Sequence, residues 1–598
     1  MQNNTLVRKE LTWDLTTIFK NDELWELEYQ AIKEILPKIA YYENQVTQTA
    51  QGLFDTLEFD HELGRRINLI YLYARLKSDQ DTTNETYQSM HLHAQSLFIQ
   101  LVSATSFIIP AILAMDEKVL AQYVASHEGL IVYRHYLKEI HSQKPHKLTN
   151  EQEKLYSQME EIASAPSQIY HVLTNAEIDF PQVMNESEER VQLTDGNYHV
   201  FLESPIRKVR NEAFFAMYET YQKRIQTLAS MLSSHVKATN KKAEIRQYSS
   251  ARHGAMSQYS IPEKVYDQLL ITIQQHLPLM HRYMALRKQL LGVQSMHLYD
   301  VSVPLKDDVQ LELSYEEAKK IIVESVAPLG VDYQKIVQQG FDNRWVDVVE
   351  NKGKKTGAYS WGAVGTNPFI LMNWQNNMDS LVTLTHEFGH SMHSYYTRQT
   401  QPLPYANYSP FLGEVAATFH EELLFEYLLN KTEDIDQKIH LLHKWLQNFC
   451  NIVFVQTMYA EFEQTIYEWD CAGEALTAQK LADLYLKLMK NYYGEALTVD
   501  EVAGVNWARI THFYYNFYVY QYATGKSAAL ALGKQMLEQG KPAADLYINA
   551  FLKAGNSDSP INILKNAGVD MQSPEPLIEA CKVFEEKLAL LENLLYNK

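Results

Sequence analysis

The residues best suited to chemistry stand in the segment THEFGH, where His386, Glu387 and His390 form the pattern H-E-x-x-H. In a helix with about 3.6 residues per turn, the two histidines project from one face one turn apart, so both imidazoles can bind a single metal ion. Glu387 lies about 100° around the same helix. It therefore stands beside the metal without being a ligand, where its carboxylate can take a proton from a zinc-bound water.

The residues around this pattern predict a buried helix. The run LVTL precedes the first histidine, Phe388 and Met392 lie within and just after the pattern, and Asp379 is a suitable N-cap at which we expect the helix to begin. Unpaired His and Glu side chains are costly in such surroundings. Burial therefore favours a metal site over a surface helix with incidental histidines.

A catalytic zinc site needs a third protein ligand and an open position. His393 is too far along the same helix to reach the shared ion, so we expect the ligand from another helix, as a carboxylate. The segment FLGEVAATFHEELLFEYLL carries Glu414 and Glu421 two turns apart on one helix face. We assign Glu414 as the third ligand and Glu421 as a group that hydrogen-bonds a ligand imidazole. On spacing alone, Glu421, Glu422 and Glu426 remain open as ligands.

Helical periodicity dominates the elements that must position these residues. Apolar side chains recur at three- and four-residue spacing over residues 24–168, 208–242 and 262–291, and again from residue 380 to the end. The predicted fold class is mostly α with a minor β element.

Two segments break the helical pattern and predict short strands. VQLTDGNYHVFL, residues 191–202, has β-forming residues on both sides of Asp195-Gly196, a dipeptide that favours a tight hairpin, and we place a domain seam near it. GAYSWGAVG and NPFILMNW, between Gly357 and Trp374, predict a small sheet beside the zinc helix. An exposed edge of this sheet could pair with an extended peptide. The alternative is a hairpin that only braces the helix.

The composition restricts partners and location. Asp and Glu total 73 against 54 Lys and Arg, a formal net charge of −19 that repels a phosphate backbone and an anionic membrane surface. Three cysteines without C-x-x-C spacing favour a reducing compartment. The N-terminal segment has no apolar run of signal-peptide length, and the longest apolar stretch, around residues 107–115, is too short to span a membrane. We expect no nucleic-acid partner, no membrane association and a cytoplasmic location.

Longer segments resemble one known family. HEFGHSMH followed by FLGEVAATFHE is similar to the thimet-oligopeptidase-like family of zinc metallopeptidases, in particular its bacterial oligoendopeptidase F branch. The likeness extends to LTWDLTTIF, VDVVENKGKKTGAYSWG and ARITHFYYNFYVYQYATG. The resemblance implies a helical ellipsoid with a deep substrate channel between an N-terminal helical lobe, residues 1–200, and a catalytic lobe, residues 201–598. It also implies hydrolysis of short peptides in the cytoplasm, and we expect no obligate protein partner.

The resemblance assigns roles to residues at matching positions. It implies one Zn²⁺ per chain, held by His386, His390 and Glu414. It further implies Glu387 as the general base and Glu421 as a residue that supports the ligands from behind.

A cluster of one histidine and several tyrosines follows further along the chain. Amide hydrolysis builds negative charge on the former carbonyl oxygen, and donors aimed at that oxygen stabilise the transition state. In the resembling family a histidine and tyrosines of this segment have that role, which implies His512, Tyr518 and Tyr522 here, with Tyr520 as a further candidate. If the segment is helical, Tyr518 and Tyr522 share a face at i and i+4. The alternative is a buried packing stripe of aromatic residues.

Together these features predict a zinc-dependent endopeptidase that hydrolyses internal bonds of short oligopeptides. The alternative is an exopeptidase, either an aminopeptidase or a carboxypeptidase, on the same scaffold. Aminopeptidases with this metal motif usually carry G-x-M-E-N upstream. The nearest segment here, GAMSQ at Gly254, lacks the glutamate that would bind a substrate amine.

Overall fold

The computed structural model describes residues 8–304 and 312–596. The expected absence of a signal peptide rests partly on residues 1–7, which lie outside the described residues. Contacts group the chain into two compact units, each built from three segments that are far apart in sequence. The first unit comprises residues 1–145, 310–427 and 532–568; the second comprises residues 146–309, 428–531 and 569–598. These units follow spatial contact rather than chain order, and the division into lobes at residue 200 stays a prediction.

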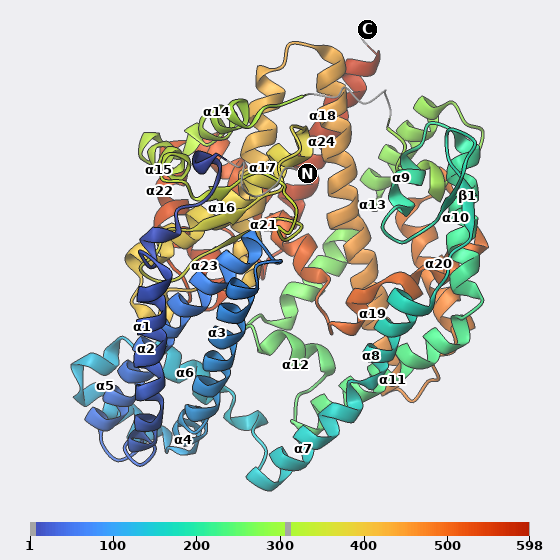
Figure 1. The fold of residues 1–598 in the computed structure, drawn as a ribbon. Helices are drawn as coiled ribbons and strands as arrows, with labels where there is room; N and C mark the ends of the chain where they lie inside the picture. The colour runs from blue at the N-terminus through green and yellow to red at the C-terminus, as the bar shows by residue number, and fades with distance from the viewer. Residues whose placement is uncertain (1–7, 305–311, 597–598) are drawn as a thin grey trace. The chain divides into compact units, whose positions relative to one another are not determined.

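Helices make up most of both units, so the predicted mostly-α class is confirmed (Figure 1). The helices of the first unit are α1 (Asp22–Ile35), α2 (Ala50–Gln80), α3 (Glu85–Ala104), α4 (Ile108–Ala114), α5 (Glu117–Ser126), α6 (Arg134–Ser142), α14 (Tyr315–Ser325), α15 (Val331–Asp342), α16 (Met378–Thr400), most of α17 (Pro410–Lys431), α22 (Lys541–Leu546) and α23 (Pro560–Asn566).

The second unit is also helical, with two short strand pairs. Its helices are α7 (Asn150–Ala163), α8 (Ala165–Val172), α9 (Tyr198–Glu203), α10 (Arg207–Gln222), α11 (Ile225–Ile245), α12 (Ala251–Ser257), α13 (Glu263–Leu291), α18 (Ile435–Phe449), α19 (Gln456–Cys471), α20 (Ala478–Tyr493), the first part of α21 (Tyr520–Gln539) and α24 (Glu575–Tyr596). Its strands are β1 (Gln182–Met184) with β2 (Arg190–Gln192), and β3 (Met296–His297) with β7 (Leu497–Thr498).

A three-stranded sheet lies in the first unit. Its strands are β4 (Val346–Asp347), β5 (Tyr359–Trp361) and β6 (Phe369–Leu371), in the order β4-β6-β5. β4 runs parallel to β6, whereas β5 is antiparallel to it, with Ser360 opposite Ile370. Helix α16 packs against β5 and β6. The small sheet that the sequence predicts beside the helix of the H-E-x-x-H pattern is therefore confirmed, and β5 is one of its edges.

The core beside this sheet centres on α2. Trp25 of α1 and Ile67 of α2 are buried in one cluster with Phe369 of β6, and α3 packs along α2 (Figure 1). The stretch Glu85–Ala114, which holds α3 and α4, is long and apolar enough to cross a membrane by length and composition alone. The buried residues of α3, such as Leu97, belong to the same core cluster, and those of α4, such as Ile112, belong to a second one. Part of this apolar surface therefore serves packing, and the absence of membrane association stays a prediction.

The hairpin predicted over residues 191–202 is displaced. β1 and β2 pair around a turn at residues 185–189, and the expected second strand is instead helix α9. The Thr194 N–H donates to Oδ1 of Asn197 at 2.8 Å, and the Asn197 N–H donates to Oγ1 of Thr194 at 3.1 Å. Because these side chains satisfy backbone groups locally, they compete with strand pairing, and a helix starts after the turn.

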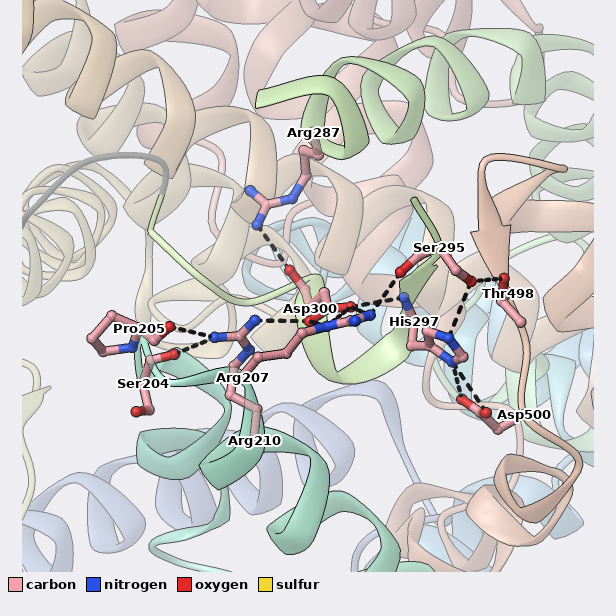
Figure 2. A network of polar contacts seen from close by, with 10 residues as sticks. All are labelled: Ser204, Pro205, Arg207, Arg210, Arg287, Ser295, His297, Asp300, Thr498 and Asp500. Atoms are coloured by element: carbon pink, nitrogen blue, oxygen red, sulfur yellow. Dashed lines mark hydrogen bonds and ion pairs between the residues drawn. The ribbon is translucent and has the colours of Figure 1, made fainter. Parts of the chain in front are cut away.

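An ion network around a buried aspartate ties several elements of the second unit together (Figure 2). Asp300 is fully buried and accepts from Arg207 and Arg210, each at 2.8 Å. Burial opposes its charge, but the two guanidinium groups hold the pKa of Asp300 below its ordinary value. The backbone N–H of His297 also donates to Asp300, and Nδ1 of the same histidine lies 2.9 Å from Asp500. The network joins α10 to β3 and to the segment after β7.

Candidate metal site

Helix α16 carries the residues of the H-E-x-x-H pattern. It begins at Met378, because Asn377 caps it by accepting a hydrogen bond from the Ser380 N–H at 2.9 Å. Asp379, the predicted N-cap, is instead in the first turn, where a negative charge suits the helix dipole. The apolar face that anchors the helix in the core consists of Leu381, Leu384, Phe388 and Met392, all fully buried.

His386, His390 and Glu414 come together in the first unit. The two imidazole rings lie one helical turn apart, with centroids 4.8 Å from each other. Oxygens of Glu414, on α17, lie 3.7 Å from Nε2 of His386 and 3.8 Å from Nε2 of His390. Donor atoms around a tetrahedral zinc ion are about 3.3 Å apart. A small movement of the Glu414 carboxylate toward the two histidines would therefore bring the three donors to that spacing. Two imidazoles and one carboxylate are a donor set of catalytic zinc sites, and these residues fit the ion.

Glu421 does not belong to this group but forms a hydrogen bond with one of its histidines. Its Oε1 lies 2.7 Å from Nδ1 of His386, which donates the hydrogen bond and leaves Nε2, on the side of Glu414, as the nitrogen that can bind a metal ion. Burial disfavours a charge on His386, but the hydrogen bond and charge of Glu421 outweigh it and raise the pKa of His386 to about 9. A more basic imidazole is a stronger electron donor. Burial lowers the pKa of His390 to about 3, so this ring is neutral with its lone pair available.

His393 lies outside the group, as the spacing predicts. Its ring is fully buried and stacks on Tyr408, with centroids 3.7 Å apart, and on Phe551 at 5.1 Å. It therefore serves packing between α16 and the segments beside it.

The two helices that bear these donors touch at Gly389. A Cβ atom at this position would lie 2.5 Å from Cα of Ala417 and 2.8 Å from the carbonyl oxygen of Ala416. Only glycine allows α16 and α17 to approach so closely, and this approach brings Glu414 within reach of both histidines.

Glu387 lies on α16 beside the metal-binding group, and its side chain is almost fully buried. Burial raises the pKa of Glu387 to about 7, although the neighbouring His386 and a hydrogen bond from the Ser360 N–H act in the opposite direction. Among the described residues, its Oε2 has no hydrogen-bond partner. A carboxylate with a pKa near neutrality and one unpaired oxygen can both accept and release a proton.

The Ser360 amide also shows which edge of the sheet faces Glu387. Alternate residues of an antiparallel strand direct their N–H and C=O groups to opposite sides. Because the N–H of Ser360 is directed to Glu387, it is not used for pairing with β6. The side chain of Ser360 contacts α16, with its Oγ 2.8 Å from Oγ of Ser391. The free edge of β5 therefore runs beside Glu387.

His512, Tyr518 and Tyr522 come together in the second unit. Nε2 of His512 lies 3.0 Å from the hydroxyl of Tyr522. The ring of Tyr518 is parallel to that of His512 at 6.2 Å and lies 5.5 Å from the ring of Tyr522. The two tyrosines do not share a helix, however, because α21 begins only at Tyr520. Asn516 and Phe517 both have positive φ, 53° and 55°, and this turn precedes the helix.

Buried partners hold this turn in place. A positive φ at a residue other than glycine costs roughly 1 to 3 kcal/mol. The Phe517 N–H donates to Oε1 of the buried Glu463 at 2.7 Å. Oδ1 of Asn516 accepts from the Tyr467 hydroxyl at 2.9 Å and lies 2.8 Å from Nε2 of His235. Buried polar groups thus compensate for the strain and fix the segment that leads into the aromatic cluster.

The remaining tyrosines of the segment divide into packing and exposed residues. Tyr514 stacks on Tyr170 at 4.4 Å, and Tyr520 is 1% exposed and lies 5.3 Å from the ring of Tyr266. The packing stripe that the sequence left open accounts for these two. Tyr515 is 51% exposed, with its ring 5.5 Å from that of His512. No role was predicted for it.

Two groups that contact the candidate site residues or hold them in place, the Ser360 amide and Glu463, were not predicted from the sequence. The Ser360 amide has no signature, because any residue supplies a backbone N–H. Glu463 could have been found, since it stands at helical spacing from Ala460 and Tyr467 on the buried face of α19. A carboxylate on such a face indicates a buried polar role. The group around His386 belongs to the first unit, and the group around His512 belongs to the second.

Comparisons with known proteins cover almost the whole chain. Residues 200–583 match the family model described as Peptidase family M3, and residues 112–180 match the one described as Oligopeptidase F. The sequence is 49% identical over 589 residues to Oligopeptidase PepF of Bacillus subtilis, covering 98% of this chain and 88% of that protein. It is 41% identical over 593 residues to Group B oligopeptidase PepB of Streptococcus agalactiae, covering 99% and 98%.

Solved structures agree in fold. A putative peptidase from Chlamydophila abortus is similar with a TM-score of 0.94 and 31% identity, over 99% of this chain and 100% of the other. Oligoendopeptidase-F from Enterococcus faecium is similar with a TM-score of 0.73 and 38% identity, over 96% of this chain and 100% of the other.

Proposed function

The chain belongs to peptidase family M3, and from this premise we propose that it is a zinc-dependent endopeptidase that cleaves internal bonds of short oligopeptides. The family makes it a metallopeptidase that acts on oligopeptides. The zinc ion, the general base and the cytoplasmic location are the further parts of the proposal. The observation that carries it is the convergence of His386, His390 and Glu414 beside the buried carboxylate of Glu387.

The chain's own groups handle the proton. Bound zinc would supply a Lewis acid that lowers the pKa of water and polarises the peptide carbonyl. Glu387 takes the proton of the attacking water on its unpaired Oε2 and later delivers it to the leaving amine nitrogen. The pKa of about 7 that burial gives Glu387 suits both transfers. Glu421 meanwhile fixes the orientation and tautomer of His386.

The aromatic cluster of the second unit is proposed to stabilise the oxyanion. His512, Tyr518 and Tyr522 offer an imidazole and phenol hydroxyls on one surface, and they are only partly buried. Such donors act on the charge that develops on the carbonyl oxygen in the transition state.

The free edge of β5 supports internal cleavage over removal of terminal residues. A strand edge binds an extended peptide through main-chain hydrogen bonds, which do not depend on the side chains of the peptide. Because this edge runs beside Glu387, a peptide paired with it would pass the base without needing a terminus there. This argument favours an endopeptidase over the exopeptidase alternative.

The test combines metal analysis with blocked peptides. Glu387→Gln should keep near-stoichiometric zinc while kcat falls by several orders of magnitude, because it removes the proton acceptor and spares the ligands. His390→Ala should lose the metal as well. The wild-type enzyme should cleave a peptide blocked at both termini, as read by mass spectrometry. Cleavage that needs a free terminus, or near-normal turnover by Glu387→Gln, contradicts the proposal.

A further inference from the structure

A cavity of about 400 Å³ lies beside β5 in the first unit. The C-terminal part of α2 forms one wall, and β5 with the chain before it forms the other. The lining residues are Tyr71, Arg75, Asp79, Lys355, Tyr359, Ser360 and Trp361. The cavity thus borders the same strand edge that runs beside Glu387.

The walls are fixed to each other by the backbone. The N–H of Lys355 donates to the carbonyl oxygen of Asp79 at 2.9 Å. The hydroxyl of Thr82, just after α2, donates to the carbonyl oxygen of Gly353 at 2.7 Å. Gly353 has a φ of 89°, and a Cβ there would lie 2.8 Å from Oδ1 of Asp81. The cavity is therefore built into the fold and does not depend on the position of one flexible side chain.

The charge that the cavity presents is positive. Asp79 is buried, with its carboxylate accepting from Arg75 at 2.9 Å and from the Tyr359 hydroxyl at 2.8 Å, while Nζ of Lys355 lies 3.5 Å away. The Asp79 side chain is 5% exposed, against 27% for Arg75 and 38% for Lys355. A molecule in the cavity therefore contacts the cations Arg75 and Lys355, whereas the carboxylate of Asp79 that they share is buried behind them. This surface stands out in a chain of net charge −19.

The pleat of β5 determines which part of a bound peptide reaches these cations. Tyr359 and Trp361 direct their side chains toward α2, where Tyr359 bonds Asp79 and the Trp361 ring lies 5.7 Å from that of Tyr71. Ser360 directs its side chain to α16. Because side chains alternate along a strand, a paired peptide would turn every second side chain toward α2.

We propose that this cavity is a substrate subsite that binds a carboxylate of the peptide through Lys355 and Arg75. The proposal rests on the peptidase function proposed above and adds a charge preference to it. A carboxylate there bridges the ammonium of Lys355 and the guanidinium of Arg75, with aromatic rings around its aliphatic stem. Since β5 carries the Ser360 amide at Glu387, the subsite serves a residue within about three positions of the cleaved bond, at about 3.3 Å per residue.

Two sources supply such a carboxylate: an Asp or Glu side chain, and the C-terminus of the peptide. The test uses a neutral peptide blocked at both termini and variants with a single Glu, Gln or Lys at each position. A second set carries a free or an amidated C-terminus. Wild-type kcat/KM should be about 5- to 10-fold higher for Glu than for Gln at one position, chiefly through KM, and the ratio should fall as ionic strength rises. If the ratio instead follows the free C-terminus, the subsite holds that carboxylate.

The variant that tests the assignment is Lys355→Gln. Its Glu-to-Gln ratio at the preferred position should fall to within about 2-fold of unity, and Lys355→Glu should invert the preference toward Lys at that position. Because these are ratios within each variant, a general loss of activity does not affect them. The control is Lys335→Gln, which removes the same charge from α15, where Lys335 is 65% exposed beside Asp332. This control should keep the wild-type ratio.

The outcomes separate this inference from the proposed function. If the wild-type enzyme fails to cleave the neutral blocked peptide, the peptidase proposal itself is wrong. If it cleaves that peptide without preferring a carboxylate at any position or at the C-terminus, only the subsite is overturned. A preference that survives unchanged in both Lys355→Gln and Lys355→Glu also overturns it, because the carboxylate is then bound elsewhere.

Discussion

Nδ1 of His386 lies 2.7 Å from Oε1 of Glu421, so a carboxylate outside the metal-binding group sets the tautomer of a residue inside it. Glu421→Ala should weaken zinc affinity about 10- to 100-fold, because His386 loses both its orientation and its added basicity. Glu421→Gln should weaken affinity less, since an amide oxygen still accepts the hydrogen bond. Glu414→Ala should abolish tight binding. Competition with a chromophoric chelator measures all three, and equal losses in Glu421→Ala and Glu414→Ala contradict the assigned roles.

Tyr522 should act on the transition state rather than on substrate affinity. Its hydroxyl lies 3.0 Å from Nε2 of His512, and Tyr522→Phe should lower kcat about 10²- to 10³-fold with KM nearly unchanged. Tyr520→Phe is the matched control, because the Tyr520 hydroxyl is buried without a hydrogen-bond partner among the described residues. It should keep activity within a few-fold. Steady-state kinetics on one peptide gives both values, and equal tolerance of both changes makes the segment structural.

Gly389→Ala should separate the two helices that carry the metal ligands. The added methyl group would meet the backbone of Ala416 and Ala417, which cannot move aside as a flexible side chain would. The free energy of unfolding should fall by about 1 to 3 kcal/mol, and zinc affinity should fall with it. Gly64→Ala, in the interior of α2 with open space around the new methyl, should instead be neutral or stabilising by about 0.5 to 1 kcal/mol. Denaturant titrations with and without zinc distinguish the two.

Glu463 should make stability fall as pH rises. Burial raises the pKa of Glu463 to about 8 from an ordinary value of 4.5. Between these values the folded chain keeps a proton that the unfolded chain releases, so this group lowers the free energy of unfolding as pH rises from about 4.5 to 8. Glu463→Gln keeps an acceptor for the Phe517 N–H and removes the titration. It should match the wild type near pH 5 and exceed it by about 1 to 3 kcal/mol at pH 8.

Urea titrations at pH 5 and pH 8 check this prediction. A Glu463→Gln variant that is less stable than the wild type at both values would show that the carboxyl is needed for more than its hydrogen bond to Phe517.

Local patterns were predictable from the sequence, and long-range ones were not. The spacing of His386 and His390, and of Glu414 and Glu421, fixes the helix faces before any tertiary contact is considered, and these side chains lie together in the structure. The amide of Ser360 at Glu387 depends on a strand edge that meets the helix only in the fold.

The failures have the same physical origin. Residues 198–203 favour a strand by composition, but the reciprocal hydrogen bonds of Thr194 and Asn197 start a helix there. The positive φ of Phe517 is unfavourable for an aromatic residue and exists because Glu463, distant in sequence, binds its N–H. The hydrophobic pattern of a short segment indicates neither the side-chain hydrogen bonds at residues 194–197 nor the distant partner of Phe517.

Because the first unit is built from three separate segments, it cannot be completed until the last of them has been translated. Both histidines and Glu414 are synthesised well before residues 532–568, which complete that unit. Helix α16 packs on this late segment, where the hydroxyl of Thr397 donates to the carbonyl oxygen of Leu552 at 2.8 Å. A nascent chain therefore contains His386, His390 and Glu414 for more than a hundred codons before the last segment of their unit is made.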